Sequence, residues 1–82
     1  MYAYRINGND IPDAVVKSCI RRMKRKPFRL MDIKNEARKS GCPEMLSYPP
    51  TDIPNILARR LISKFKRDGL LEKVGRIHWR IV

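Results

Sequence analysis

The chain has 82 residues, which is enough for one domain with one modest hydrophobic core. Lysine and arginine number 19 against 8 acidic residues, giving a formal net charge of +11 at pH 7. No stretch approaches the roughly 18–20 apolar residues that a membrane span requires, and we expect no signal peptide at the N-terminus. The charge excess favours a polyanionic partner, with nucleic acid ahead of an anionic membrane surface or an acidic protein.

The two cysteines, Cys19 and Cys42, are too few for a disulfide scaffold, and with His78 as the one histidine they make no zinc site. We expect reduced thiols in a cytoplasm, bacterial or phage in context, or in a nucleus if the source is eukaryotic. Cys19 is expected in the core and Cys42 at the surface. The sequence has no glycine-rich phosphate loop, no usefully spaced carboxylate pair and no nucleophile–base set, so we expect no enzyme activity, cofactor or metal.

Residues 1–9 are predicted to form an irregular or weakly extended arm, and residues 10–82 the folded domain. Asp10 is expected to cap a first helix, with Pro12 in its first turn. The helix is predicted to end near Lys26, because the following Pro27 disfavours helical geometry at that residue. Its expected buried stripe consists of Val15, Val16, Cys19, Ile20 and Met23.

Residues 28–30 are too few for a helix and are predicted to add a single rung to a sheet. A second helix is predicted from about Met31 to Ser40, terminated by Gly41. Three prolines make residues 42–50 a loop, and its apolar side chains predict that it packs against the domain. The expected inward residues of the second helix are Ile33 and Ala37.

The third helix is predicted to begin after capping oxygens from Thr51 and Asp52 and to end before Gly69. Apolar residues recur in it at steps of three and four, which is typical of an amphipathic helix. Acidic residues are found only at its two ends, at Asp52 and Asp68, with cations between them. Its expected apolar stripe consists of Ile53, Leu57, Ala58, Leu61, Ile62 and Phe65.

Two β-prone runs, 70–74 and 77–82, flank Gly75 and Arg76 and predict a hairpin with a two-residue turn. Alternation along the strands predicts which face covers the helices. The expected inward residues are Val74, Ile77, Trp79 and Ile81, and the expected outward residues are Lys73, His78 and Arg80.

This order of elements resembles the winged helix-turn-helix DNA-binding superfamily, and it is similar to its small stand-alone members in phages and mobile elements. The resemblance covers residues 11–82. It implies an α+β winged helix, in which three helices carry a small antiparallel sheet with a C-terminal wing. One departure is the loop at 42–50, which is longer than the turn of a compact helix-turn-helix. The resemblance is carried by Ile33, Ala37, Gly41, Leu57, Leu61, Ile62, Phe65, the junction 67–72 and the wing 75–80.

The third helix is expected to enter the major groove of double-stranded DNA. Asn55 can then pair with adenine and Arg59 with guanine, whereas Ser63 and Lys64 suit phosphate. Arg76 at the turn is the leading wing contact, and the basic end of the first helix is a candidate backbone clamp. The candidate DNA-binding residues are Asn55, Arg59, Arg60, Ser63, Lys64, Arg67, Lys73, Arg76, Arg80, Lys24 and Arg25.

Other interpretations stay open at the level of sequence. The same charge suits an RNA-binding or ribosome-associated winged helix, a module for an acidic protein partner, or merely a solvated helix face. Within the DNA hypothesis, transcriptional regulation and an architectural or recombination role are both compatible, as are a monomer and a homodimer.

Overall fold

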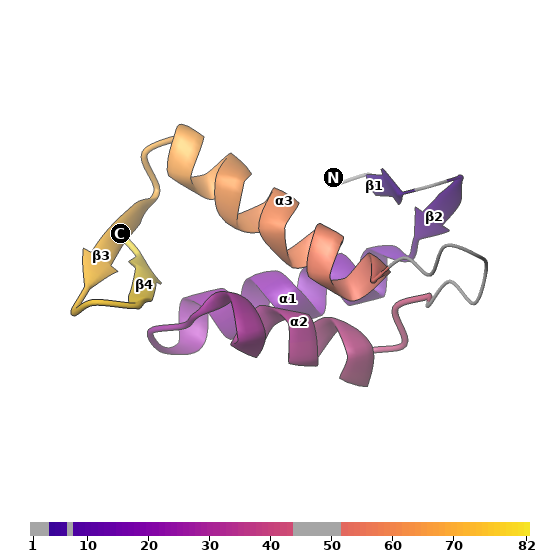
Figure 1. Ribbon diagram of the computed structural model, residues 1–82, viewed down its shortest axis with the longest axis horizontal. Coiled ribbons are helices and arrows are strands. Elements are labelled where there is room, and N and C mark those ends of the chain that lie inside the picture. The colour runs from indigo at the N-terminus through magenta and orange to yellow at the C-terminus, as the bar shows by residue number, and fades with distance from the viewer. Residues whose placement is uncertain (1–3, 7, 44–51) are drawn as a thin grey trace.

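Three α-helices pack together, and a short β-hairpin lies at each end of this helical body (Figure 1). The computed structural model describes residues 4–6, 8–43 and 52–82. Each hairpin is a separate antiparallel sheet of two strands, which confirms an α+β class. The arrangement is compatible with a winged-helix layout. In chain order the elements are β1 (Tyr4–Ile6), β2 (Asn9–Ile11), α1 (Asp13–Arg25), α2 (Leu30–Lys39), α3 (Ile53–Arg67), β3 (Leu71–Val74) and β4 (His78–Ile81).

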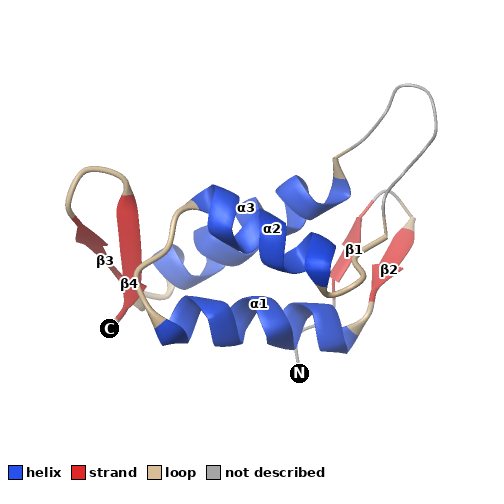
Figure 2. Cartoon of the chain, turned by 90° about the horizontal axis from the view of Figure 1, so that it is seen from below, coloured by secondary structure: helices blue, strands red, loops and turns tan. Residues whose placement is uncertain are grey.

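Each helix buries the apolar stripe that its periodicity predicts. All five stripe residues of α1 are buried, as are both of those in α2. In α3 the expected stripe is buried except for Ile62, which is half-buried against the core. Figure 2 shows α1 and α2 side by side, with α3 packed behind them. Burial of these stripes is what holds three short helices together, since isolated helices of 10–15 residues are marginal in water.

The N-terminal segment is a hairpin and not an irregular arm. Tyr4 pairs with Ile11, Arg5 with Asp10 and Ile6 with Asn9. Ile6 is only 1% exposed and belongs to the core, so the hairpin packs with the domain. Residues 1–3 and 7 lie outside the described part of the chain.

The expected start of the first helix at Asp10 was wrong. Asp10 lies in β2, and α1 begins at Asp13 after Pro12. The reason is burial of Ile11, since the strand that places this side chain in the core ends one residue before Pro12. The chain then turns into α1 without a side-chain cap.

The expected sheet rung at 28–30 is confirmed for its first residue. The Phe28 N–H donates to the Trp79 carbonyl, and the Trp79 N–H to the Phe28 carbonyl, both at 2.8 Å. Phe28 is fully buried. Leu30 does not join the sheet, because α2 begins there, one residue before its predicted start. The Asp32 carboxylate accepts from the Arg29 N–H at 2.8 Å and closes the first turn of α2.

α3 begins at Ile53, as predicted, with Pro54 in its first turn, where a missing N–H does no harm. The Asp52 carboxylate caps it by accepting from the Asn55 N–H at 3.2 Å. The second predicted capping residue, Thr51, and the expected packing of the loop fall among residues 44–51, outside the described residues.

The C-terminal hairpin differs from its prediction in turn and faces. Its turn has three residues, beginning with Gly75 at φ +68°, because Val74 pairs with His78. Lys73 therefore lies opposite Trp79 on the face that packs toward the core, and Val74 lies on the other face. Ile77, expected inward, is in the turn and 56% exposed.

Candidate nucleic-acid interface

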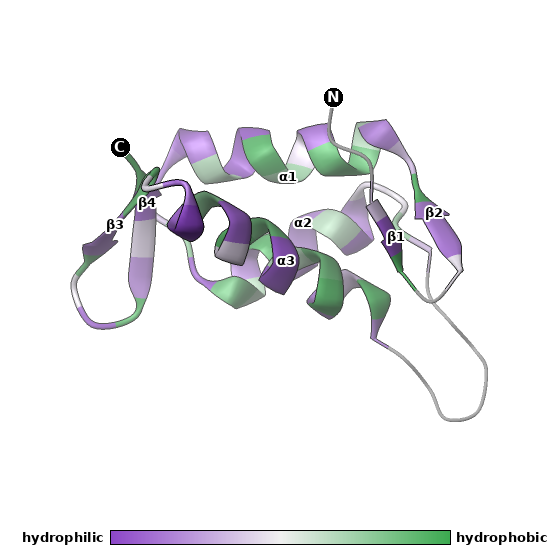
Figure 3. Cartoon of the chain, turned by 90° about the horizontal axis from the view of Figure 1, so that it is seen from above, coloured by the Kyte–Doolittle hydropathy of each residue, from purple (hydrophilic) through white to green (hydrophobic). Residues whose placement is uncertain are grey.

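One row of side chains along α3 carries the candidate base contacts. Asn55, Arg59 and Ser63 follow at four-residue steps, and Arg67 continues the row. Asn55 is half-buried, and the other three are exposed. In Figure 3, hydrophilic positions in purple recur along α3. Within the described chain neither Arg59 nor Arg67 makes an ion pair, so both guanidinium groups have donors available for a ligand.

Two other predicted cations of α3 are engaged within the protein. The Arg60 Nη1 donates to the Arg5 carbonyl of β1 at 3.1 Å. The Lys64 Nζ lies 3.3 Å from the Asp68 carboxylate at the end of the helix. Exposed pairs of this kind contribute at most about 1 kcal/mol. A phosphate could therefore compete for Lys64, but Arg60 is directed towards the N-terminal hairpin.

The two predicted arginines of the β3–β4 hairpin differ in their partners among the described residues, since Arg80 forms an ion pair and Arg76 does not. Arg76 is exposed in the three-residue turn. Arg80 forms an ion pair with Glu72, which faces it across the two strands. Arg76 is therefore the better placed of these two predicted contacts to meet an external anion.

Two lysines converge on Trp79 where α3 meets the wing. The Lys73 Nζ lies 4.5 Å from the centre of the indole ring, and the Lys66 Nζ lies 5.1 Å from it. An aromatic face attracts ammonium groups electrostatically, so the half-buried ring contacts two positive charges, one from α3 and one from β3. Lys66 was not singled out from the sequence. The recurrence at steps of three and four from Arg59 through Ser63 to Lys66 could have indicated it.

The predicted clamp at the end of α1 lies on a different helix from the α3 row. Lys24 and Arg25 are both exposed. Arg25 lines an open cleft between α1 and α2, together with Arg21, Arg22 and residues of α2. Arg25 therefore faces the cleft, whose other wall is formed by Glu36 and Lys39 of α2.

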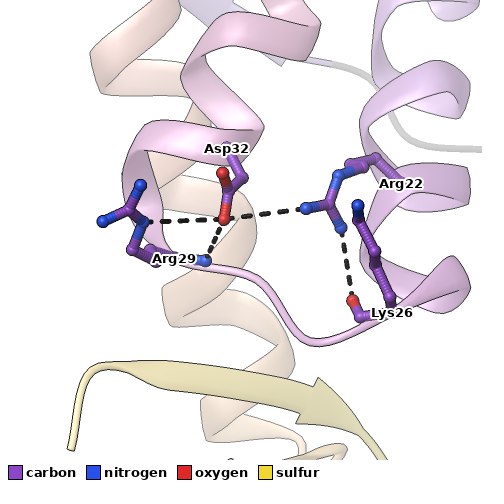
Figure 4. A network of polar contacts seen from close by, with 4 residues as sticks. All are labelled: Arg22, Lys26, Arg29 and Asp32. Carbon is purple, nitrogen blue, oxygen red and sulfur yellow. Dashed lines mark hydrogen bonds and ion pairs between the residues drawn. The ribbon is translucent and has the colours of Figure 1, made fainter.

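Arg22 has a structural task in the turn between α1 and α2. It lies 3.6 Å from the Asp32 carboxylate and donates to the Lys26 carbonyl at 3.3 Å (Figure 4). Its side chain is only 9% exposed. The same carboxylate lies 3.8 Å from the Arg29 guanidinium, so Asp32 holds α1, the turn and α2 together.

Asp52 fixes the start of α3 against α2. Its carboxylate lies 2.6 Å from the Lys34 Nζ and 3.9 Å from the Arg38 guanidinium. The hydrogen bond from Lys34 holds the pKa of Asp52 below its ordinary value of 3.8, and the cap bond from the Asn55 N–H acts in the same direction. The orientation of the α3 row is thereby tied to α2.

Both cysteine side chains are buried and carry free thiols. This burial corrects the expectation that Cys42 lies at the surface. Its side chain turns inward at the end of α2, where its N–H bonds to the Ala37 carbonyl. Burial raises the pKa of Cys19 to about 12, so its reactive thiolate is scarce at neutral pH. In the part of the chain that the structure describes, no three histidine, cysteine or acidic side chains gather as a metal site would require.

Comparison with known proteins found no matching family, no similar curated protein and no similar solved structure. Among the described helices, none has the length and apolar character needed to cross a bilayer.

Proposed function

We propose that the chain is a winged-helix domain that binds double-stranded DNA, with α3 in the major groove and β3–β4 on the neighbouring backbone. Its biological role would be transcriptional regulation or an architectural or recombination function. The observation that carries the proposal is the row on α3 in which Arg59 and Arg67 are exposed and make no ion pair with described residues. A solvated helix face ordinarily interleaves charges of both signs, whereas α3 has no acidic residue between its two ends.

The dimensions of α3 suit this role. Fifteen helical residues extend about 22 Å, and a helix with its side chains is about 10–12 Å across. The major groove of B-DNA is about 12 Å wide. In this arrangement the guanidinium of Arg59 bonds to O6 and N7 of a guanine, while Ser63 and Arg67 contact phosphates farther along the groove.

The junction between α3 and the wing supplies the backbone contact. A phosphate next to the groove meets Lys66 and Lys73 above Trp79, and Arg76 reaches the backbone from the turn. Each phosphate neutralised in this way releases condensed counterions, which makes the affinity fall steeply with salt.

The test measures binding of fluorescent ligands by anisotropy. A preferred duplex is first selected from a random pool, and its affinity is compared with that of a scrambled duplex. We expect Arg59→Ala to lose about 1–3 kcal/mol on the selected duplex and little on the scrambled one. Lys17→Ala removes an exposed cation from α1 and serves as the matched control. Equal losses on both duplexes would refute base reading by Arg59.

Competition separates the alternative functions. Structured RNA that displaces the selected duplex at lower concentration would support an RNA-binding domain, which uses the same charge without base readout. Displacement by polyglutamate at lower concentration than by either nucleic acid would support an acidic protein partner. Duplex DNA is expected to be the strongest of the three competitors.

A further inference from the structure

The positive charge of the chain is not confined to α3 and the wing. Ten of the 19 basic residues lie between positions 13 and 41, on α1, α2 and their connection, with only three acidic residues among them. Residues 53–82 hold eight basic residues. One duplex on α3 and the wing therefore leaves the basic residues of α1 and α2 without an external anion, and only Arg22, Arg29, Lys34 and Arg38 of them pair with described carboxylates.

Part of this second charge gathers at the open cleft between α1 and α2. The cleft continues into a second hollow that shares Arg22, Arg25, Glu36 and Lys39 with it. Five basic residues and two acidic residues line the two hollows together. The basic ones are Arg21, Arg22, Arg25, Lys26 and Lys39, and the acidic ones are Asp32 and Glu36.

The cleft opens on a different side of α2 from the one that α3 covers. Lys34 and Arg38 reach Asp52 at the start of α3. Glu36 and Lys39 line the cleft instead, and Asp32 lines the second hollow beside it. Helical positions turn by about 100° each, so these two sets lie on different sides of α2. Figure 4 shows the ion pair between Arg22 and Asp32 in front, with the ribbon of α3 behind that of α2.

Three cations of the cleft are available to an anion. Arg21, Arg25 and Lys39 make no ion pair with any described residue, whereas Arg22 is occupied by Asp32 and the Lys26 carbonyl. The Ser18 hydroxyl lines the same wall and can also donate to an oxygen. Two guanidinium groups, an ammonium and a hydroxyl match the acceptor oxygens of a phosphodiester backbone.

We propose that the cleft between α1 and α2 binds the sugar–phosphate backbone of a second duplex, so that one molecule bridges two DNA segments. This proposal rests on the proposed function, because the first segment occupies α3 and the wing. The cleft reads no sequence, since its donors meet phosphate oxygens and not base edges. The Glu36 carboxylate opposes the bound phosphate and limits the affinity of the cleft.

A bridging experiment tests the proposal. Biotinylated duplex is fixed to beads, free fluorescent duplex is added, and the fluorescence retained by the protein is measured. Single-duplex affinity is measured by anisotropy in parallel. Wild-type protein is expected to retain the free duplex. The Arg21→Ala/Lys39→Ala variant should lose about tenfold in retention, because two phosphate contacts are removed, while its single-duplex affinity changes less than about threefold.

Two further variants sharpen the result. Arg5→Ala/Lys17→Ala removes the same charge outside the cleft and should retain the free duplex within about twofold of wild type. Glu36→Gln should increase retention by relieving repulsion. Melting followed by circular dichroism confirms that each variant is folded.

The outcomes separate this inference from the function on which it rests. Absence of single-duplex binding by the wild type overturns the proposed function. Single-duplex binding without retention overturns the bridging inference alone. Retention that survives Arg21→Ala/Lys39→Ala also overturns it, and sedimentation would then show whether two copies of the chain bridge the duplexes.

Discussion

The two hairpins are similar in length but differ in what they do for the molecule. β1–β2 buries Ile6 and Ile11 in the core, and its Arg5 carbonyl accepts from Arg60 of α3. β3–β4 buries none of its residues fully, and its turn carries an exposed arginine and an exposed isoleucine. One hairpin therefore contributes buried residues to the core, whereas the other packs against the core with half-buried side chains and exposes its turn. A two-stranded hairpin can stabilise the core or expose charged side chains at its turn. Which of the two it does depends on where its apolar side chains lie relative to the turn.

The largest expected effect concerns stability. Ile6→Ala should lower the free energy of unfolding by about 2–5 kcal/mol, because it empties a fully packed site. Ile77→Ala in the exposed turn should change it by less than about 0.5 kcal/mol. Chemical denaturation monitored by circular dichroism measures both. If both variants lost a similar free energy of unfolding, the two hairpins would not differ in their contribution to stability.

The second effect concerns DNA binding, for which we expect the β3–β4 hairpin to matter and the β1–β2 hairpin not to matter. Arg76→Ala should weaken binding of all duplexes and reduce the slope of log affinity against log salt by about 0.9, the contribution of one phosphate. Arg5→Ala is the matched control in the other hairpin, where the guanidinium lies 3.7 Å from Asp10. Its slope should remain that of the wild type. An unchanged slope for Arg76→Ala would place the wing away from DNA.

A smaller effect uses the single tryptophan of the chain, Trp79, as an internal reporter. Two ammonium groups lie over its ring, so a phosphate that draws them away should change its emission. Duplex titration should therefore shift or quench the fluorescence at the same concentrations that change the anisotropy. Lys66→Gln should reduce this optical change, and a constant spectrum through saturation would exclude contact at this junction.

The smallest effect concerns acid stability at the start of α3. The pKa of Asp52 is lowered in the folded state, so its stabilising contribution is present above its ordinary value of 3.8 and is lost as pH falls through the folded value. The side chain is 41% exposed, so solvent screening limits the contribution to about 1 kcal/mol or less. Asp52→Asn should flatten the decline of unfolding free energy below about pH 4. An identical decline in both proteins would show that the pair with Lys34 contributes nothing.

The helices were predictable from the sequence because their signals are local. Apolar spacing located the buried residues of α1 and α2, and the Asp52 cap located the start of α3. The N-terminal hairpin was missed because each strand has only three residues, and helix-capping residues follow directly. The hairpin is defined mainly by the burial of Ile6 and Ile11 in a core that also includes residues distant in sequence. A short stretch of sequence does not contain this information.

The candidate site was only partly predictable for a related reason. Exposure of Arg59 and Arg67 follows from the period of α3. The faces of β3–β4 depend on turn length, and one additional turn residue moved Val74 to the outer face and Lys73 to the Trp79 face. Acidic partners decide which cations are available to bind an external anion. Asp68 pairs with Lys64 and Glu72 with Arg80, and these pairs can be identified only in the folded chain.

The pairing of Phe28 with Trp79 also has a consequence for how the chain folds. The two residues are about 50 positions apart, so their hydrogen bonds form only after a long segment has lost the entropy of loop closure. The helices can associate through closer contacts first, and we expect docking of the last strand to be a late folding event with a φ-value near zero. Truncation of Trp79 should therefore accelerate unfolding much more than it slows folding. Stopped-flow kinetics would then distinguish a wing that is added to a formed helical body from one that organises it.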